Sequence, residues 1–96
     1  MKLTINAAHI APTCPDTLAC YPYFGKDPFI LKNLPHVYFC GNQTEYKHEI
    51  HRVIQHESFD VVKENKIHLI CVPKFRTSHS CVFLNIRTLE SEEYKF

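Results

Sequence analysis

Histidine is the residue type in this sequence that most readily suggests chemistry. The chain has 96 residues and seven histidines. His48, His51 and His56 fall in the segment HEIHRVIQH, and the first two would share one face if the segment were a helix. Zinc modules usually present two close pairs of ligands, whereas this chain contains neither a CxxC nor an HxxxH pair. We therefore interpret the three histidines as exposed polar residues and predict no metal ligand among them.

His36 and Cys40 form a second possible ligand pair, in the segment HVYFC. An extended chain would place them on one side of a strand but about 13 Å apart. That separation is too large for both to bind one ion without a bend. We interpret them as a hydrogen-bonded histidine beside a core cysteine.

Cys14 and Cys20 are the candidates for nucleophilic catalysis, with a histidine as base and Asp16 or Asp27 to orient it. Their spacing does not show that these groups converge, and a lone cysteine is weak evidence without a local signature. Each aspartate adjoins a proline, so we interpret both as Asx-type turn caps. The sequence also contains no GxGxxG or GxSxG motif. We predict no catalytic and no cofactor-binding residue.

Charge gives little support for direct binding to nucleic acid. Eleven basic and ten acidic residues leave a net charge of +1, so there is no excess positive field to hold phosphates. Lys74, Arg76 and His79 form a local basic cluster, which we interpret as a solvated turn. No apolar window approaches a membrane span of about 18 to 20 residues, and no apolar run at the N-terminus suits a signal peptide. The chain is expected to be soluble and intracellular.

Cysteine usage favours a reducing compartment. The five cysteines are an odd set without short paired spacings, unlike a disulfide framework. Cys40, Cys71 and Cys81 lie in apolar runs, where a free cysteine behaves as a small hydrophobic residue. We predict that these three are core residues.

The elements that must position these residues begin with a loop over residues 12–35. Five of the six prolines fall there, and each removes a backbone donor and favours an extended predecessor. A regular helix is therefore excluded. Loops of this length with aromatic side chains usually cover a site or a partner surface.

Strand-like runs follow the loop. Residues 36–40, 66–72 and 80–86 are rich in β-branched and aromatic side chains. Both faces of 66–72 are largely apolar, which is typical of an interior strand of a covered sheet. The polar segment 73–80 is expected to be the turn of a hairpin that joins 66–72 to 80–86.

Two further segments complete the expected core. The segment 46–62 fits either helix or strand, with a preference for strand over 50–56. Residues 92–96 suit a short edge strand. We predict a strand-rich α+β fold in a single partial domain over 1–96, in which 12–35 is the proline and aromatic loop and 36–96 the strand-rich core.

Four sequence blocks, taken in order, carry a family resemblance. They are HIAPTCPDTLACYPYFGKDPFI, PHVYFCGNQ, VPKF and NIRTLE. Together they resemble the C-terminal part of the small, second (B-type) subunits of eukaryotic DNA polymerase delta, from about residue 9 to residue 96. One block would be weak, but four in the family's order with similar spacing are specific.

The resemblance implies a fold and the loss of a metal site. Members of this family are similar to a calcineurin-like metallophosphoesterase, and this chain matches the C-terminal portion of its β-sandwich, with antiparallel and mixed strands. In active phosphoesterases the strand that corresponds to HVYFC ends in a Gly-His-x-His turn that binds two metals. The turn here is Gly41, Asn42, Gln43 and Thr44, and an amide oxygen is a weaker ligand than imidazole. The resemblance therefore implies a degenerate metal-site turn, no bound metal or cofactor, and no catalysis.

The resemblance also implies partners. It suggests a non-catalytic accessory subunit, or a fragment of one, in the nucleus. That subunit would bind the C-terminal metal-binding domain of the catalytic subunit of DNA polymerase delta and the third subunit. It would contact DNA only through the complex, and it would not bind a membrane. Interface cores are rich in aromatic residues. The candidate interface residues are accordingly Tyr21, Tyr23, Phe24 and Phe29.

Two alternatives from other classes remain open. One is a small metal-dependent phosphoesterase using His36, His48 and His51, whose hydrolysis would vanish with a chelator. The other is a zinc-stabilised nucleic-acid-binding module, whose binding would depend steeply on salt. The net charge argues against the second alternative and Asn42 against the first.

The length of the chain leads to a prediction about its behaviour in isolation. Typical members of the resembled family are several times longer. Residues 66–72 are therefore expected to lack sheet partners on their flanks, and exposed strand edges promote aggregation. Poor solubility is predicted for the chain expressed alone, and a monodisperse monomer that unfolds cooperatively would contradict this.

Overall fold

The computed structural model describes residues 1–56 and 58–96. These residues form two compact units, Met1–Leu34 and Pro35–Phe96, and each unit is described by itself. The single partial domain over 1–96 stays a prediction. None of the helices in the described ranges has the length and apolar character needed to cross a membrane.

The first unit is a short helix followed by a closed loop. Helix α1 (Lys2–Asn6) leads into a chain without regular structure, whose two ends meet where His9 bridges Ile30. The amide of Ile10 donates to the carbonyl of Phe29 at 2.9 Å, and the amide of Leu31 donates to the carbonyl of Ala8 at 2.8 Å. The predicted loop over 12–35 is confirmed, since this range contains no helix or strand beyond that bridge.

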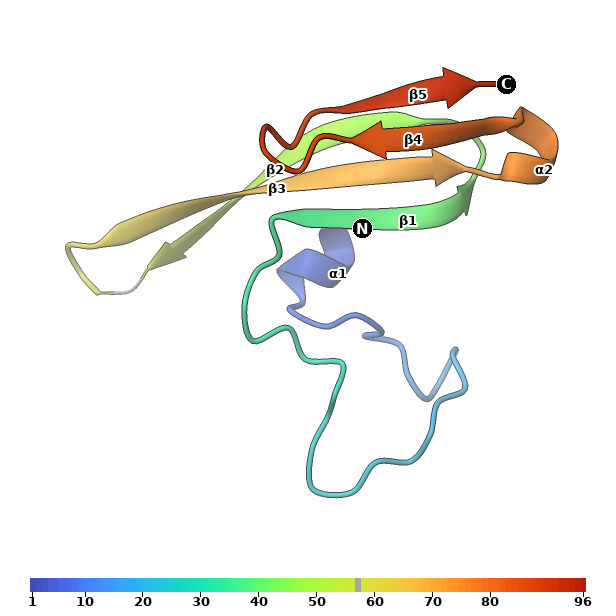
Figure 1. The fold of residues 1–96 in the computed structure, drawn as a ribbon. Helices are drawn as coiled ribbons and strands as arrows, with labels where there is room; N and C mark the ends of the chain where they lie inside the picture. Colours follow the sequence, from blue (N-terminus) through green and yellow to red (C-terminus); the bar gives the residue numbers. More distant parts are fainter. Residues whose placement is uncertain (57) are drawn as a thin grey trace. The chain divides into compact units, whose positions relative to one another are not determined.

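A mixed three-stranded sheet forms the main part of the second unit (Figure 1). Its strands are β1 (Val37–Gln43), β2 (Lys47–His56) and β3 (Val62–Pro73). The order is β1-β3-β2, with β1 parallel and β2 antiparallel to β3. The predicted strands over 36–40, 50–56 and 66–72 are confirmed.

Strand β3 is the interior strand, as its two apolar faces indicated. Ile67 and Leu69 point to one face and Ile70 to the other, and their side chains are 0 %, 4 % and 2 % exposed. The expectation that residues 66–72 lack sheet partners is wrong, because β1 and β2 occupy both edges of β3. Poor solubility stays a prediction, and it rests on exposed apolar side chains such as Phe39 (68 %) and Ile54 (61 %).

The chain leaves the first sheet through a helical turn, which contradicts the predicted hairpin. Residues 75–78 form α2 (Phe75–Ser78), and the carbonyl of Lys74 accepts bonds from the amides of Thr77 and Ser78, both at 3.0 Å. His79 then adopts a left-handed conformation with φ 50°. This reversal directs the chain into a second sheet, so residues 80–84 do not pair with β3.

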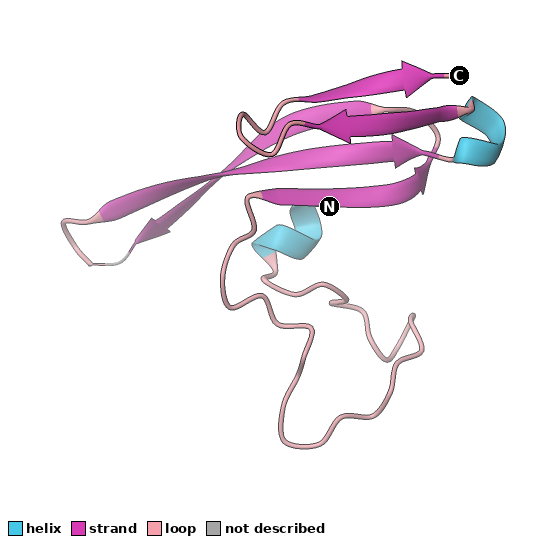
Figure 2. Cartoon of the chain, viewed as in Figure 1, coloured by secondary structure: helices cyan, strands magenta, loops and turns pink. Residues whose placement is uncertain are grey.

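The second sheet has two antiparallel strands, β4 (Ser80–Leu84) and β5 (Ser91–Lys95). The expected edge strand near the C-terminus is confirmed. The strand predicted over 80–86 ends at Leu84, because the Asn85 side chain accepts bonds from the amides of Arg87 (3.0 Å) and Thr88 (3.3 Å) and starts a turn. Figure 2 shows the resulting predominance of strands, and the strand-rich α+β class with mixed and antiparallel sheets is confirmed.

The prediction that Cys40, Cys71 and Cys81 are core residues is wrong. All three are only half-buried. Cys81 lines an open cavity of about 460 Å³ whose other walls are mainly apolar side chains of β1, β3 and β4. The two-stranded sheet leaves this space unfilled, so an apolar run in the sequence does not guarantee burial here.

Candidate functional site

Aromatic side chains gather on the loop of the first unit. The rings of Tyr21 and Tyr23 meet edge to face with centroids 5.1 Å apart, and Tyr23 meets Phe29 in the same way at 6.1 Å. Such pairs are favourable beyond the area that they bury. Tyr21 is nevertheless 71 % exposed and Phe24 94 % exposed. Tyr23 is also exposed, whereas Phe29 is half-buried. We call this sequence-predicted set the aromatic loop surface (Tyr21, Tyr23, Phe24 and Phe29), and its role as an interface stays a prediction.

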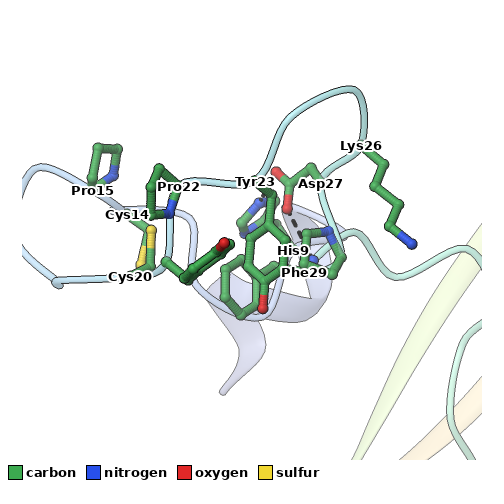
Figure 3. A pocket seen from close by; sticks show the side chains of 11 residues that line it. His9, Cys14, Pro15, Cys20, Pro22, Tyr23, Lys26, Asp27 and Phe29 are labelled. Carbon is green, nitrogen blue, oxygen red and sulfur yellow. Dashed lines mark hydrogen bonds and ion pairs between the residues drawn. The ribbon is translucent and has the colours of Figure 1, made fainter.

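A cavity of about 300 Å³ lies beside this surface (Figure 3). His9 and Asp27 face one another in its wall, with His9 Nε2 2.7 Å from Asp27 Oδ2. The other carboxylate oxygen of Asp27 accepts the amide of Phe29 at 2.9 Å, which confirms the Asx turn predicted for Asp27. The bond to His9, and then the bond to Phe29, hold the pKa of Asp27 below its usual value. The turn cap predicted for Asp16 stays a prediction.

The tautomer of His9 follows from its neighbours. The amide of Ala11 donates to His9 Nδ1 at 3.1 Å, so this nitrogen carries no proton and Nε2–H donates to Asp27. Both ring nitrogens are therefore engaged. His9 has no free nitrogen with which to take a proton from a thiol.

The structure does bring Cys14 and Cys20 to the same cavity as His9 and Asp27. Burial, followed by the hydrogen bond to Cys20, raises the pKa of the Cys14 thiol above its usual value. A catalytic cysteine needs the opposite shift. The cysteine, histidine and aspartate side chains considered as a catalytic set therefore lie together, but they do not provide an activated nucleophile.

The predicted degenerate turn is mostly strand. Gly41, Asn42 and Gln43 continue β1, and only Thr44 belongs to the following bend. The register against β3 shifts between Cys40 and Gln43, and Asn42 has φ 55°. These features mark a β-bulge. The chain reverses after the bulge, at residues 44–46 between β1 and β2.

The side chains of this bulge bind one another. The side-chain amide of Gln43 donates through Nε2 to the carbonyl of Gly41 at 3.0 Å and to Cys40 Sγ at 3.3 Å. Across the residues that the structure describes, no three or more His, Cys, Asp or Glu side chains are arranged to hold a metal ion.

Asn42→Val is expected to lower the free energy of unfolding by about 1–2 kcal/mol, since a β-branched residue is disfavoured in the left-handed conformation that Asn42 adopts. Gly41→Ala is the matched control. A Cβ at Gly41 meets no atom within 4 Å, so its effect should stay within about 0.5 kcal/mol. Urea denaturation followed by circular dichroism measures both, and equal losses would contradict the bulge.

His48 belongs to a hydrogen-bond network that links the two sheets. Its Nε2 lies 2.9 Å from His68 Nδ1, and its Nδ1 lies 2.9 Å from Ser91 Oγ. The Tyr46 hydroxyl donates to the carbonyl of Ser91 at 2.7 Å. Strands β2, β3 and β5 are thereby joined through side chains.

His51 and His56, the other histidines of the segment HEIHRVIQH, do not join His48 in a common site. In strand β2, side chains three residues apart point to opposite faces, so a shared His48 and His51 helical face is excluded. The prediction of exposed histidines is confirmed for His56 and wrong for His48 and His51, which are half-buried. His36 precedes β1 and is exposed.

The basic cluster predicted as a solvated turn surrounds helix α2. Lys74, Arg76 and His79 are all exposed. Their exposure agrees with the solvated interpretation, although the local structure is helical instead of a hairpin turn.

Acid is expected to destabilise the second unit through His68. Its pKa is lowered from the ordinary 6.5, first by burial and then by the nearby positive groups His48 and Lys66. The unfolded chain then binds more protons than the folded chain, so stability is full above about pH 6.5 and falls as the pH drops through the folded pKa. The melting temperature should fall by a few degrees between pH 7 and pH 5.

Variants separate this effect from general acid lability. His68→Gln is expected to flatten the dependence of melting temperature on pH, whereas His56→Gln, at an exposed position of β2, should leave it unchanged. An unchanged slope in His68→Gln would contradict the assignment.

Sequence reasoning missed His9, Tyr46, His68 and Ser91. Their partners lie 18 to 45 residues away along the chain. No local pattern announces such pairs, because they depend on which segments the fold places together.

Comparison with known proteins identifies the family. Residues 1–49, about half of the chain, match the profile of the family of DNA polymerase alpha/epsilon B subunits. The chain belongs to this family. Within that class it is similar to the DNA polymerase delta small subunits of Oryza sativa subsp. japonica (41 % identity over 96 residues) and of Saccharomyces cerevisiae (40 % over 95 residues), and to DNA polymerase delta subunit 2 of Drosophila melanogaster (38 % over 96 residues). The resemblance to delta small subunits is confirmed.

These alignments cover nearly all of this chain but little of each relative. They include 100 %, 99 % and 100 % of the chain, and 20 %, 18 % and 20 % of the rice, yeast and fly proteins. The chain therefore spans about a fifth of the length of the curated relatives that it matches.

Proposed function

We propose that this chain acts as part of a non-catalytic accessory subunit of DNA polymerase delta in nuclear DNA replication. The observation that carries the proposal is 41 % identity to a DNA polymerase delta small subunit over the whole chain. A relationship of this strength makes a shared fold and a related role the simplest explanation. Polymerase activity would belong to the catalytic partner.

The same proposal assigns residues 1–96 to the C-terminal portion of a calcineurin-like phosphoesterase sandwich, with 36–96 as its strand-rich core. In support, a mixed sheet and a two-stranded sheet border an open apolar cavity. Phe39 and Phe83 are 68 % and 56 % exposed, which suits a surface that a larger sandwich would cover. Asn42 and Thr44 stand where an active enzyme of that fold would carry imidazoles, so the subunit would hold no catalytic metal.

The proposed role is that of a scaffold. The aromatic loop surface would contact the C-terminal metal-binding domain of the catalytic subunit or the third subunit, because exposed clustered aromatic side chains are typical of interface cores. DNA would be reached only through the complex, and no cofactor is needed for such a role.

The rival metal-dependent phosphoesterase loses a required ligand. Both ring nitrogens of His48 are hydrogen-bonded, to His68 and to Ser91. A zinc-stabilised nucleic-acid module would need several ligands in one place and a basic surface, and the net charge of +1 gives no support for the second.

Co-expression tests the accessory role directly. The tagged chain is co-expressed with the C-terminal cysteine-rich region of the catalytic delta subunit from the same organism, and capture is measured at increasing salt. Capture that survives moderate salt supports the scaffold. Failure of capture by a chain that circular dichroism shows to be folded would overturn it, and metal analysis of that sample would then test the phosphoesterase.

A further inference from the structure

We propose that Cys14 and Cys20 are a thiol modification site, which a low-molecular-weight disulfide such as glutathione disulfide converts into a reversible intrachain disulfide. This inference goes beyond the accessory role and does not depend on it. It concerns the loop of the first unit alone.

Placement of the two side chains is the first support. Cys14 and Cys20 line the same cavity, and the Cys20 thiol is close enough to contribute to the raised pKa of the Cys14 thiol. Their sulfur atoms lie next to one another in Figure 3. Both residues are half-buried, so a small reagent can reach them while the surrounding chain keeps them together.

Local structure holds the pair in place. The amide of Cys14 donates to the carbonyl of Ala11 at 3.1 Å, and the amide of Thr17 donates to the carbonyl of Thr13 at 3.0 Å. These two turns bend the chain between Cys14 and Cys20. A short loop with both sulfurs already adjacent loses little further freedom when the bond forms, so the effective concentration of one thiol at the other is high.

The reaction balances with the oxidant named. The thiolate of one cysteine attacks a sulfur of glutathione disulfide, forms a mixed disulfide and releases one glutathione thiolate. The second cysteine then attacks the protein sulfur of the mixed disulfide, forms the Cys14–Cys20 bond and releases the second glutathione. Both cysteines are oxidised, one glutathione disulfide is reduced to two glutathione molecules, and the two thiol protons pass to those products.

Among the other cysteines, Cys40 and Cys71 are register partners on the paired strands β1 and β3, whereas Cys81 lies in the other sheet. A bond between Cys40 and Cys71 would join two different tryptic peptides, so its mass distinguishes it from closure of the Cys14 and Cys20 pair. Cys40, Cys71 and Cys81 are expected to stop at the mixed disulfide or to stay reduced. Partial burial also raises the pKa of Cys14, so the rate of closure should increase as the pH rises above neutrality.

One proteolytic peptide reports the reaction. Trypsin releases residues 3–26 as a single peptide that contains Cys14 and Cys20 and no other cysteine. The full chain is equilibrated with glutathione and glutathione disulfide at graded ratios, quenched with acid, alkylated, digested and measured by mass spectrometry. The expected product is a 3–26 peptide lighter by two hydrogens, at ratios where most of the other three thiols are still alkylated.

Two comparisons make the test decisive. The same titration in concentrated urea should lower the equilibrium constant for closure by about tenfold or more, since unfolding removes the held geometry. In Cys14→Ser or Cys20→Ser the remaining cysteine should carry one glutathione, whereas Cys81→Ser should behave as the unchanged chain. A 3–26 peptide with two glutathiones, an intermolecular disulfide, or equal closure in urea would overturn the proposal.

Discussion

Ile67→Ala is expected to lower the free energy of unfolding by about 2 to 5 kcal/mol. Ile67 is 0 % exposed in the interior strand β3, so the substitution removes buried methyl groups and leaves a cavity that neighbouring strands cannot fill. For a domain of this size such a loss is a large part of the total stability. Urea denaturation of the chain, held at a concentration that prevents aggregation, measures it.

Ile54→Ala is the matched control for that experiment. Ile54 lies in the same sheet, on β2, but is 61 % exposed. Its truncation should change the unfolding free energy by no more than about 0.5 kcal/mol. Similar losses for both variants would mean that the described sheet does not bury Ile67.

The double variant Tyr21→Ala with Phe24→Ala is expected to weaken capture of the catalytic delta region by about 30-fold or more. Exposed, clustered aromatic side chains are frequent binding hot spots, and loss of a hot spot worth about 2 kcal/mol corresponds to that factor. The measurement is a binding titration of the co-purified partner against each variant. This prediction rests on the proposed accessory role.

Phe59→Ala controls for the loss of an exposed aromatic ring elsewhere. Phe59 is fully exposed in the connection between β2 and β3, outside the aromatic loop surface. It should leave capture unchanged. If the double variant binds as well as the unchanged chain, the accessory role survives but the interface lies elsewhere. If the unchanged chain itself does not bind, the result counts against the accessory role.

Local sequence signals determined the elements of this protein. The cluster of prolines between residues 12 and 35 excludes a helix there, because proline lacks the donor and the freedom that a helix needs. The apolar faces of residues 66–72 indicate an interior strand, because side chains alternate along a strand and both faces must be covered. The family resemblance was likewise readable, since it rests on ordered blocks of sequence.

Pairing between segments was decided only by the tertiary structure. The sequence favoured a hairpin from 66–72 to 80–86, whereas a helical turn at 75–78 sends β4 to pair with β5. Both arrangements satisfy the local polarity, and the choice depends on long-range packing that no short window contains.

The candidate sites follow the same division. Tyr21 and Phe24 could be selected as interface candidates from residue type alone, because large aromatic side chains are favourable in interfaces whatever their neighbours. The bond of His9 to Asp27, which removes a base from the cavity, and the adjacency of Cys14 and Cys20 arise only when the loop closes on itself. Reactivity depends on distances between such groups, and those distances are properties of the folded loop.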